Sequence, residues 1–580
     1  MSVKENGLQS SSQSDRQWLT AIFLVALLAT AVVAPMFFLG NASGHDFQPH
    51  VAGWIEAAGQ WREGIFFPRW AQWANSGFGE PRFIFYPPGS WMFGAALGSV
   101  LPWKAVPGAF VWLTLIIAGI SMWKFAGQWL SPTQAIAAAL FFAANPYHLS
   151  VIFYRSAFAE LLASALFPLM FLGTFGVLRQ EWRRVPLLAF AFAGIWLSNA
   201  PAAVIATYSL ALSLTVVCIV GRTIRPWVLG GLSMLAGFGV TAFYLIPAWW
   251  EQRWVQIAHV ASTTFDPEKN FLFTRVNDPE FIQFNWKISA VALALMLFTG
   301  VGIALSFRQR RPRRKVWWTL ALLSVACVIL MLPPSAWLWR HLPELRFVQF
   351  PWRWLLVLGF AFAFFGAAAG NLKRRVIWWA ILITTICATA ITISGDTSWS
   401  SDDVSSVVED IRAARGYDGI EGFAPLSANV DELDDELPLV GEYDPSSGDI
   451  DEPAEAQVNT VRWSTESKVF DVKSDGPVTL ALKLLNYPAW QVRVDGNSLS
   501  ASTAAQTGQL LVPLSAGSHH VEIDFRRTPD RTVGLFISIL SIVGLLIPAG
   551  FMLRSKGMPP DRKASATSGR NRLTAARRDS

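Results

Sequence analysis

The stretch WLTAIFLVALLATAVVAPMFFL, residues Trp18–Leu39, and the GNASGHDFQPH that follows it, Gly40–His50, decide how this chain folds. The first part is an apolar run of about 20 residues, the length that an α-helix needs to cross a bilayer. The second part places Asp46 just beyond that run, between two histidines. A carboxylate at a bilayer boundary needs water or a partner, and such a residue often marks a functional site. The stretch therefore predicts a membrane protein with a polar site near Asp46.

The composition of the whole chain supports this prediction. Of the 580 residues, 52% are hydrophobic and only 15% are charged, whereas soluble domains carry about 25% charged residues. Basic residues exceed acidic ones by six, but they lie in short loops beside apolar runs. That placement is typical of signals that orient membrane helices, so we expect a lipid bilayer as a partner and no nucleic acid.

Apolar runs of spanning length, or nearly so, recur along the chain and predict about twelve transmembrane helices. The positive-inside rule assigns the basic clusters between them to the cytoplasm, with both termini, 1–17 and the basic tail 554–580. The number of spans agrees with this placement of the basic clusters only if Tyr86–Trp103 does not cross the membrane. This segment contains two consecutive prolines and is predicted to be half-embedded on the outer face. The predicted spans are Trp18–Leu39, Ala105–Gly127, Pro132–Pro146, Ala157–Leu178, Val185–Asn199, Ala202–Val220, Pro226–Trp249, Ile288–Phe307, Val316–Leu332, Trp354–Gly370, Val376–Ile393 and Thr532–Leu553.

The predicted membrane domain, 18–393, contains a large first outer loop, 40–104, and a short outer turn, Tyr147–Ser156. No titratable residue falls at the middle of a predicted helix, although proton- or ion-coupled transporters usually need one there. The pattern therefore argues against a pump or symporter.

A hydrophilic insert ahead of the last helix, 532–553, is predicted to form an external region. Its first part, 394–455, is acidic and is expected to be irregular, and its densest patch, Asp431–Glu436, lacks the pattern of an EF-hand loop. Its second part, 456–531, has short alternating runs separated by turn signals, which predict a small antiparallel β-sandwich. Tyr487 and Trp490 either bind a glycan there or pack in a core or interface. The predicted strands are Gln457–Trp463, Lys468–Lys473, Val478–Leu485, Gln491–Val494, Gln509–Pro513 and His520–Phe525.

Clustered polar groups in the outer loops indicate where chemistry could take place. Asp46 is a candidate general base for a hydroxyl group, and Glu160, just inside the fourth predicted helix, is a second candidate catalytic carboxylate. The two could share Mg²⁺ or Mn²⁺, because oxygen ligands suit these ions. A guanidinium group can donate two parallel hydrogen bonds to phosphate oxygens. The candidate ligands for the donor phosphate are therefore Arg155, Arg346 and Arg353. The other candidate groove residues are His45, His50, Tyr86, His148 and Trp352.

Each of these candidates also has a structural interpretation. Asp46 can cap a helix that starts directly after it, since Asp is a favoured N-cap. Arg155 and Glu160 can form a structural ion pair, and Arg353 can anchor the membrane interface beside its neighbouring tryptophans. The two histidines that flank Asp46 can form a zinc site only with a third ligand.

The order of these features resembles the C-type (GT-C) membrane glycosyltransferases. One spanning helix is followed by an outer loop that opens on an acidic residue, and a Tyr-Pro-Pro sequence precedes a half-embedded helix. The segment Ala144–Glu160 resembles that family's connection between its third and fourth helices, which often carries a second acidic residue. Shorter pieces resemble bacterial YfhO-like proteins and the related membrane family labelled 6-pyruvoyl-tetrahydropterin synthase-related. These pieces are Arg69–Trp70, Gly77–Pro81, Phe85–Pro88, Phe350–Arg353, Tyr487–Trp490, Val494–Gly496 and Ala516–His519.

The resemblance implies transfer of a sugar from a polyprenyl-phosphate carrier to a glycan, lipid or protein acceptor, on the outer face of a bacterial inner membrane and with inversion. It gives Asp46 the role of base or acceptor-orienting carboxylate and Glu160 that of second acidic residue. The sequence departs from the Asp-x-Asp form of some relatives, which argues against strict metal dependence. The alternative is a non-catalytic envelope protein or a lipid-linked glycan transporter with the same fold. Close approach of Asp46 to Glu160 around an outward cavity, together with at least one of Arg155, Arg346 or Arg353, would favour the enzyme. Dispersal of these residues into separate caps and anchors would favour the alternative.

Overall fold

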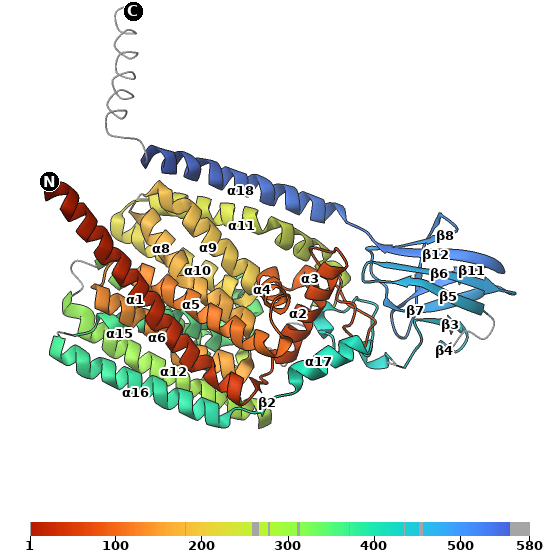
Figure 1. Ribbon diagram of the computed structural model, residues 1–580, viewed down its shortest axis with the longest axis horizontal. Helices are drawn as coiled ribbons and strands as arrows, with labels where there is room; N and C mark the ends of the chain where they lie inside the picture. Colours follow the sequence, from red (N-terminus) through yellow and green to blue (C-terminus); the bar gives the residue numbers. More distant parts are fainter. Residues whose placement is uncertain are drawn as a thin grey trace, which may run out of the picture.

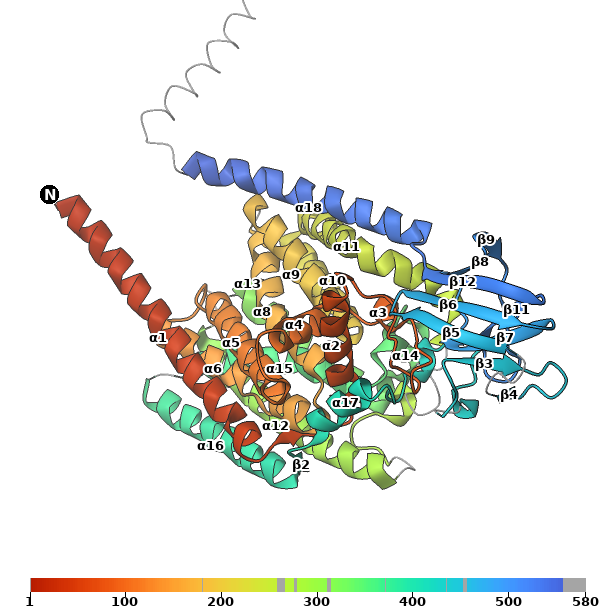
Figure 2. The same cartoon turned by 45° about the vertical axis from the view of Figure 1, so that its right-hand side comes forward.

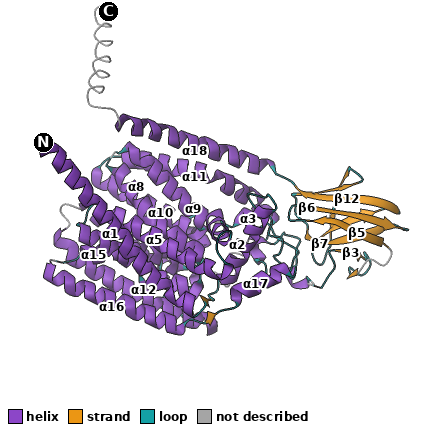
Figure 3. Cartoon of the chain, in the orientation of Figure 1, coloured by secondary structure: helices purple, strands orange, loops and turns teal. Residues whose placement is uncertain are grey.

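The computed structural model describes residues 2–179, 181–257, 266–275, 279–309, 314–370, 372–433, 436–451 and 456–556. A block of long helices carries a β-sandwich beyond one end, and the last helix returns from the sandwich along the block (Figure 1, Figure 3). Some sequence predictions lie outside the described residues: the tail beyond residue 556, part of the Arg308–Lys315 basic cluster, and Asp434 and Asp435 of the acidic patch.

All twelve predicted spans are helical, but not all of them are long enough to cross a membrane. Within the described ranges, ten helices are long and apolar enough, or eleven if the pair Arg314–Leu330 and Pro333–His341, bent by 92°, is one span. Helix α9 has 14 residues and is about 21 Å long, shorter than the bilayer core. The chain is therefore a multi-pass membrane protein with ten or eleven candidate spans among the described residues. The helices at the twelve predicted spans are α1 (Ser2–Phe38), α5 (Val106–Ala126), α6 (Pro132–Ala143), α8 (Phe158–Leu178), α9 (Val185–Ser198), α10 (Ala200–Gly221), α11 (Arg225–Glu251), α12 (Pro279–Ser306), α13 (Arg314–Leu330), α15 (Leu355–Ala368), α16 (Leu372–Asp396) and α18 (Pro529–Lys556).

The predicted outer turn Tyr147–Ser156 is wrong, because this segment is helical and buried. After α6, the Asn145 side chain accepts hydrogen bonds from the backbone N–H groups of Tyr147 and His148 and starts α7 (Pro146–Ser150). The chain continues through the π-helical turn η2 (Val151–Arg155), and Ser156 ends it in a left-handed conformation. The apolar residues within η2 are buried, so the segment belongs to the bundle. Arg155 thereby lies at the end of a span, directly before α8.

The first outer loop folds into three helices: α2 (Phe47–Arg62), α3 (Arg82–Phe85) and α4 (Pro88–Gly98). Helix α4 has 11 residues and, at about 16 Å, is too short to cross a bilayer, as predicted for this segment. It packs closely on α2, because a Cβ atom on Gly94 would lie 2.2 Å from the Trp54 ring. The loop is thus a packed unit on top of the bundle.

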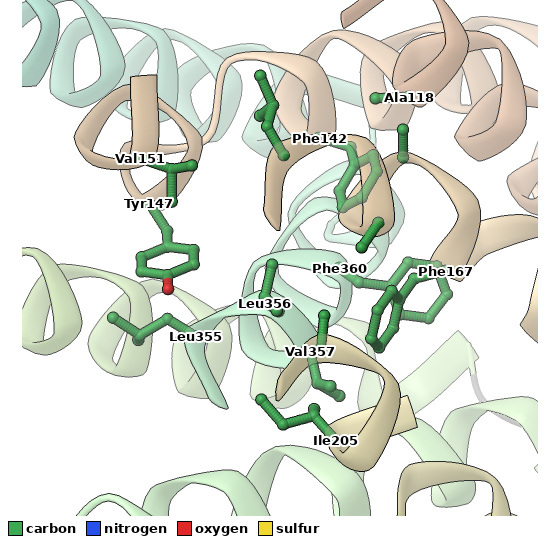
Figure 4. Close-up of a cluster of buried hydrophobic side chains, with 14 of the residues drawn as sticks. Ala118, Phe142, Tyr147, Val151, Phe167, Ile205, Leu355, Leu356, Val357 and Phe360 are labelled. Carbon is green, nitrogen blue, oxygen red and sulfur yellow. The ribbon is translucent and has the colours of Figure 1, made fainter. Parts of the chain in front are cut away.

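The core of the bundle is apolar and rich in aromatic rings (Figure 4). Helix α15 is buried along its whole length, so its neighbours surround it. Its Phe360 stacks on Phe171 of α8 with ring centroids 4.8 Å apart, and Phe142 and Phe167 lie in the same cluster. This packing fixes α15, and hence the turn that precedes it, relative to α8.

The external region is a sandwich of two five-stranded sheets, ordered β10-β11-β7-β3-β4 and β5-β6-β12-β8-β9. All six predicted strands are present. The segment 394–455 is not wholly irregular, because it contributes β2, α17 (Asp403–Arg412), β3 and β4. The short β1 pairs with β2 and ties the first outer loop to the end of α16. The strands are β1 (Asn41–Ala42), β2 (Trp399–Ser400), β3 (Val440–Tyr443), β4 (Ile450–Asp451), β5 (Ala456–Trp463), β6 (Ser467–Ser474), β7 (Val478–Leu485), β8 (Trp490–Val494), β9 (Asn497–Leu499), β10 (Ser502–Thr503), β11 (Gln509–Leu514) and β12 (Gly517–Phe525).

The sandwich is joined to the first outer loop by aromatic packing. Tyr487 and Trp490 are buried, and their ring centroids lie 5.9 and 5.4 Å from that of Trp70. Phe525 packs on the same group. Of the two interpretations of Tyr487 and Trp490, the structure therefore supports interface packing, and neither ring is available to a glycan.

Candidate functional site

Asp46 lies immediately before α2, just beyond the C-terminal end of the first span. Its side chain makes no capping hydrogen bond, so helix capping does not account for it. Its backbone N–H donates to the carbonyl oxygen of Arg155 at 2.9 Å. Gly44 allows this approach, because a Cβ atom there would lie 2.4 Å from the Arg155 carbonyl carbon. The start of α2 is therefore attached to the end of η2.

The Arg155 guanidinium bridges the two candidate carboxylates. Its Nη2 lies 2.9 Å from Asp46 Oδ2, and its Nη1 lies 2.6 Å from Glu160 Oε2. The face of the Trp352 ring covers it, with the guanidinium carbon 4.9 Å from the ring centroid. The Asp46 side chain is 41% exposed, whereas that of Glu160 is 1% exposed. Only Asp46 of the two carboxylates is thus open to an incoming molecule.

Glu160 lies in the first turn of α8 and is fully engaged with protein groups. Tyr147 donates its hydroxyl to Glu160 Oε1, while Arg353 Nε lies 3.3 Å from Oε2, an ion-pair contact without hydrogen-bond alignment. Arg353 Nη1 also donates to the carbonyl of Val348 and the side chain of Gln349, each at 2.8 Å. The buried carboxylate is thus flanked by two guanidiniums, which compensates the cost of burying its charge. Sequence reasoning assigned no role to Tyr147 or Gln349, although both lie in segments that it singled out.

Aromatic side chains form the rim beside Asp46. His45 is exposed, and its ring lies 6.2 Å from those of Phe281 and Phe284 at the start of α12. Phe284 in turn lies 5.5 Å from Trp352. His45 and Trp352 therefore belong to one aromatic border of the site.

His50 and Tyr86 line a small cavity of about 20 Å³ whose lining does not include Asp46, and His50 is buried against aromatic rings. Its ring lies 5.8 Å from Tyr86 and 5.5 Å from Phe158. Burial lowers the pKa of His50 to about 4, so the ring is neutral at neutral pH. Burial raises the pKa of the Tyr86 hydroxyl. Both residues act here as uncharged wall groups.

Two candidate residues do not join the site. His148 is buried in the bundle, where its ring nitrogens face Ser164 Oγ at 2.7 Å and the Ala143 carbonyl at 3.2 Å. Arg346 is exposed on η11 (Leu345–Val348), and the carboxylate on which its charge acts is Glu268. Within the described part of the chain no contact links either residue to Asp46 or Glu160.

The residues present do not fit a divalent cation. The Arg155 guanidinium lies between Asp46 and Glu160, where a shared ion would have to bind. Among the described residues no group of three or more His, Cys, Asp or Glu side chains could hold a metal. We therefore derive no step through a metal ion.

A second buried polar cluster fixes the first outer loop beneath the site. Glu80 pairs with Arg82 at 2.7 Å. Glu56 accepts hydrogen bonds from the Trp73 backbone N–H and the Tyr417 hydroxyl, both at 2.7 Å. Burial raises the pKa of Glu56 to about 7. Tyr417 comes from the external region, far along the chain, and no sequence signal distinguished it.

The chain was compared with known proteins. It matches no family model and no curated protein. It is similar to the arabinofuranosyltransferase AftD from Mycobacteria, at 17% identity and a TM-score of 0.41, over 67% of this chain and 27% of that one. It is also similar to an oligosaccharyltransferase from Archaeoglobus fulgidus, at 14% identity and a TM-score of 0.41, over 66% of this chain and 56% of that one.

A second structure from Archaeoglobus fulgidus, of the oligosaccharyltransferase AglB with an inhibitory peptide and a dolichol-phosphate, matches at 12% identity and a TM-score of 0.40, over 70% of this chain and 56% of that one. These neighbours are GT-C glycosyltransferases, the superfamily that the sequence resembles. The chain spans about a quarter of AftD and just over half of the archaeal enzymes. TM-scores of 0.40 and 0.41 are too low for these similarities to carry an argument about the site or its substrates. The YfhO-like resemblance stays a prediction.

Proposed function

We propose that this protein is a membrane glycosyltransferase that moves a sugar from a polyprenyl-phosphate donor to a cell-envelope glycan, lipid or protein on the extracytoplasmic face. One observation carries the proposal: Asp46 is a partly exposed carboxylate at the end of a span, oriented by Arg155. Arg155 is itself held by the buried Glu160. A carboxylate positioned in this way can act as a general base on a hydroxyl.

The proposed reaction is a single displacement at the anomeric carbon. The acceptor oxygen forms a bond to that carbon as the bond to the phosphate oxygen breaks, and the configuration inverts. The acceptor proton passes to Asp46, and the polyprenyl phosphate departs with the bonding electron pair. The guanidiniums of Arg155 and Arg353 supply positive charge for the departing phosphate.

The geometry changes the role proposed for Glu160 and leaves out Arg346. Glu160 is buried, and its oxygens face Tyr147, Arg155 and Arg353. It therefore acts as a positioning residue that holds both arginines rather than as a base. Arg346 has no part in this proposal, because it is exposed beside Glu268.

The test is membrane incubation with a panel of radiolabelled polyprenyl-phosphate sugars. Wild type is compared with Asp46→Asn and with Asp475→Asn, which changes an exposed carboxylate in the β6–β7 turn. We expect transfer by wild type and Asp475→Asn and loss of transfer by Asp46→Asn. Equal transfer by all three would remove Asp46 from catalysis. Lack of transfer by wild type with every donor would favour the non-catalytic envelope protein or the lipid-linked glycan transporter.

A further inference from the structure

A cavity of about 340 Å³ lies at the opposite ends of the spans from Asp46. The first and third spans begin there, at Arg16 and Pro132, and α5 and α8 end there. Figure 2 shows α1 running along α5 and α6 toward that end. The cavity is lined by Gln17, Trp123, Lys124, Gln128, Leu172 and Arg184. It is independent of the Asp46 site and combines polar and apolar walls.

Positive charge gathers at the rim of this cavity. The Lys124 ammonium lies 5.2 Å from the centroid of the Trp18 ring. That ring packs against Trp123 with centroids 5.3 Å apart and the ring planes tilted by 47°. Within the described residues no carboxylate forms an ion pair with Lys124. Arg184 shares a single carboxylate, Glu181, with Arg179, at 3.3 and 2.9 Å. Lys124 and Arg184 line the cavity and no carboxylate is among its lining residues, so the rim carries net positive charge.

The surrounding groups match the layers of a lipid monolayer. The Trp18 and Trp123 indoles lie at the ends of their spans, where tryptophan is enriched at membrane interfaces. The side chains of Gln17 and Gln128 make no hydrogen bond within the described part of the chain and border the same space. Leu172 supplies an apolar wall on the bundle side. Basic pockets between transmembrane helices on the cytoplasmic side are suited to anionic head groups.

We propose that this cavity binds the head group of an anionic phospholipid. The phosphate would lie between Lys124 and Arg184, and the two glutamine amides would donate to the glycerol and ester oxygens. The apolar wall and the indoles favour a lipid over free phosphate, because an acyl chain covers them. The arginine-rich loops at this end place the site in the cytoplasmic leaflet by the positive-inside rule.

The test is native mass spectrometry of the full chain in detergent, with phosphatidylglycerol and phosphatidylcholine added in equal amounts. We expect wild type to retain phosphatidylglycerol in preference. The double variant Lys124→Gln, Arg184→Gln should lose roughly tenfold of this preference, since it removes both cations that line the cavity and would contact the phosphate. Arg183→Gln removes an adjacent exposed cation that does not line the cavity, and it should leave the preference unchanged.

Two results would overturn this proposal. One is equal retention of phosphatidylglycerol by wild type and a double variant whose helical circular dichroism matches wild type. The other is displacement of the lipid by soluble glycerol 3-phosphate at equal concentration, which would assign the site to a free phosphate. If the double variant does not fold, the single variant Lys124→Gln is measured instead. It should fold, because the exposed Lys124 side chain forms no ion pair among the described residues. The same two results would overturn the proposal with this variant.

Discussion

Asp46 and Arg155, 109 positions apart in the chain, are joined through both backbone and side chain. The Asp46 N–H donates to the Arg155 carbonyl, and Arg155 Nη2 donates to Asp46 Oδ2, each at 2.9 Å. The backbone bond sets the position of Asp46, and the side-chain bond sets the direction of its carboxylate. The site therefore exists only when the first outer loop is docked on η2.

Replacing Arg155 with lysine should leave Asp46 without a side chain that both orients its carboxylate and pairs with Glu160. An ammonium group cannot bridge Asp46 and Glu160 as a planar guanidinium does. We expect transfer to fall by at least about a hundredfold, because misorientation of a catalytic group costs that much. Sugar transfer in membranes measures the effect, with Arg415→Lys, an exposed pair with Asp410, as the matched control. Retained transfer by Arg155→Lys would show that bridging is not required.

The two carboxylates should differ in their effect on stability. Glu160→Gln leaves Arg155 and Arg353 buried without their shared anion, so we expect a loss of about 3–5 kcal/mol. Asp46→Asn removes a partly exposed partner and should cost less than about 1 kcal/mol. Thermal unfolding of the purified protein in detergent measures both. Equal losses would contradict the assignment of Glu160 as the positioning residue.

Docking of the β-sandwich should depend on a buried carboxylate at the end of α11. Glu251 accepts from Arg531 Nε at 2.7 Å and from the Tyr487 hydroxyl at 2.6 Å. Tyr487→Phe removes a hydrogen bond to a charged group, worth about 1.5–3 kcal/mol. We expect faster hydrogen exchange in β8 and at the start of α18, with the bundle unchanged. Tyr443→Phe, on β3, serves as the control, and equal exchange in both variants would refute the role of this contact.

Glu56 should make stability depend on pH. Burial raises its pKa from 4.5 to about 7, so the folded chain holds a proton that the unfolded chain releases. Its stabilising contribution is present below pH 4.5 and is lost as pH rises through 7. Glu56→Gln mimics the protonated form, and its stability relative to wild type should rise by roughly 3 kcal/mol over this range. The lowered pKa of His50, about 4, makes the stability of both proteins rise with pH and so opposes the effect of Glu56. The measurement is therefore the difference in stability between wild type and Glu56→Gln, taken from thermal unfolding at several pH values. A constant difference would contradict the prediction.

The sequence was sufficient to predict the helices and strands with a clear hydrophobic periodicity. It was not sufficient where contacts between distant segments determine the local structure. Hydropathy located a helix at each of the twelve predicted spans, and alternation located six of the eight described strands from 456 onward, missing the short β9 and β10. It missed β3, because four residues in an acidic segment are too few to show an alternating pattern. These residues form a strand because they pair with β7 in the folded sandwich. It ended the third span at Pro146 and treated Tyr147–Ser156 as a turn, because it did not anticipate that the Asn145 side chain caps a new helix there.

The candidate site was predicted in part for the same reason. Asp46, Arg155, Glu160 and Arg353 each follow or begin an apolar run, and such positions meet at one end of a bundle. Arg346 and His148 also lie beside apolar runs, but Arg346 is exposed on η11 and the His148 ring faces Ser164 inside the bundle. Tyr417 could not be identified, because its carboxylate partner, Glu56, lies hundreds of residues away. Packing of Tyr487 at an interface was among the interpretations, but its hydrogen bond to Glu251 could not be predicted for the same reason.

The most direct measurement compares the rate of sugar transfer by wild type and Asp46→Asn, both reconstituted in vesicles with the same donor and acceptor and both shown to unfold at the same temperature. The account predicts a loss of at least about a hundredfold in the variant, the usual contribution of a positioned general base. Equal rates from two equally folded proteins would contradict it.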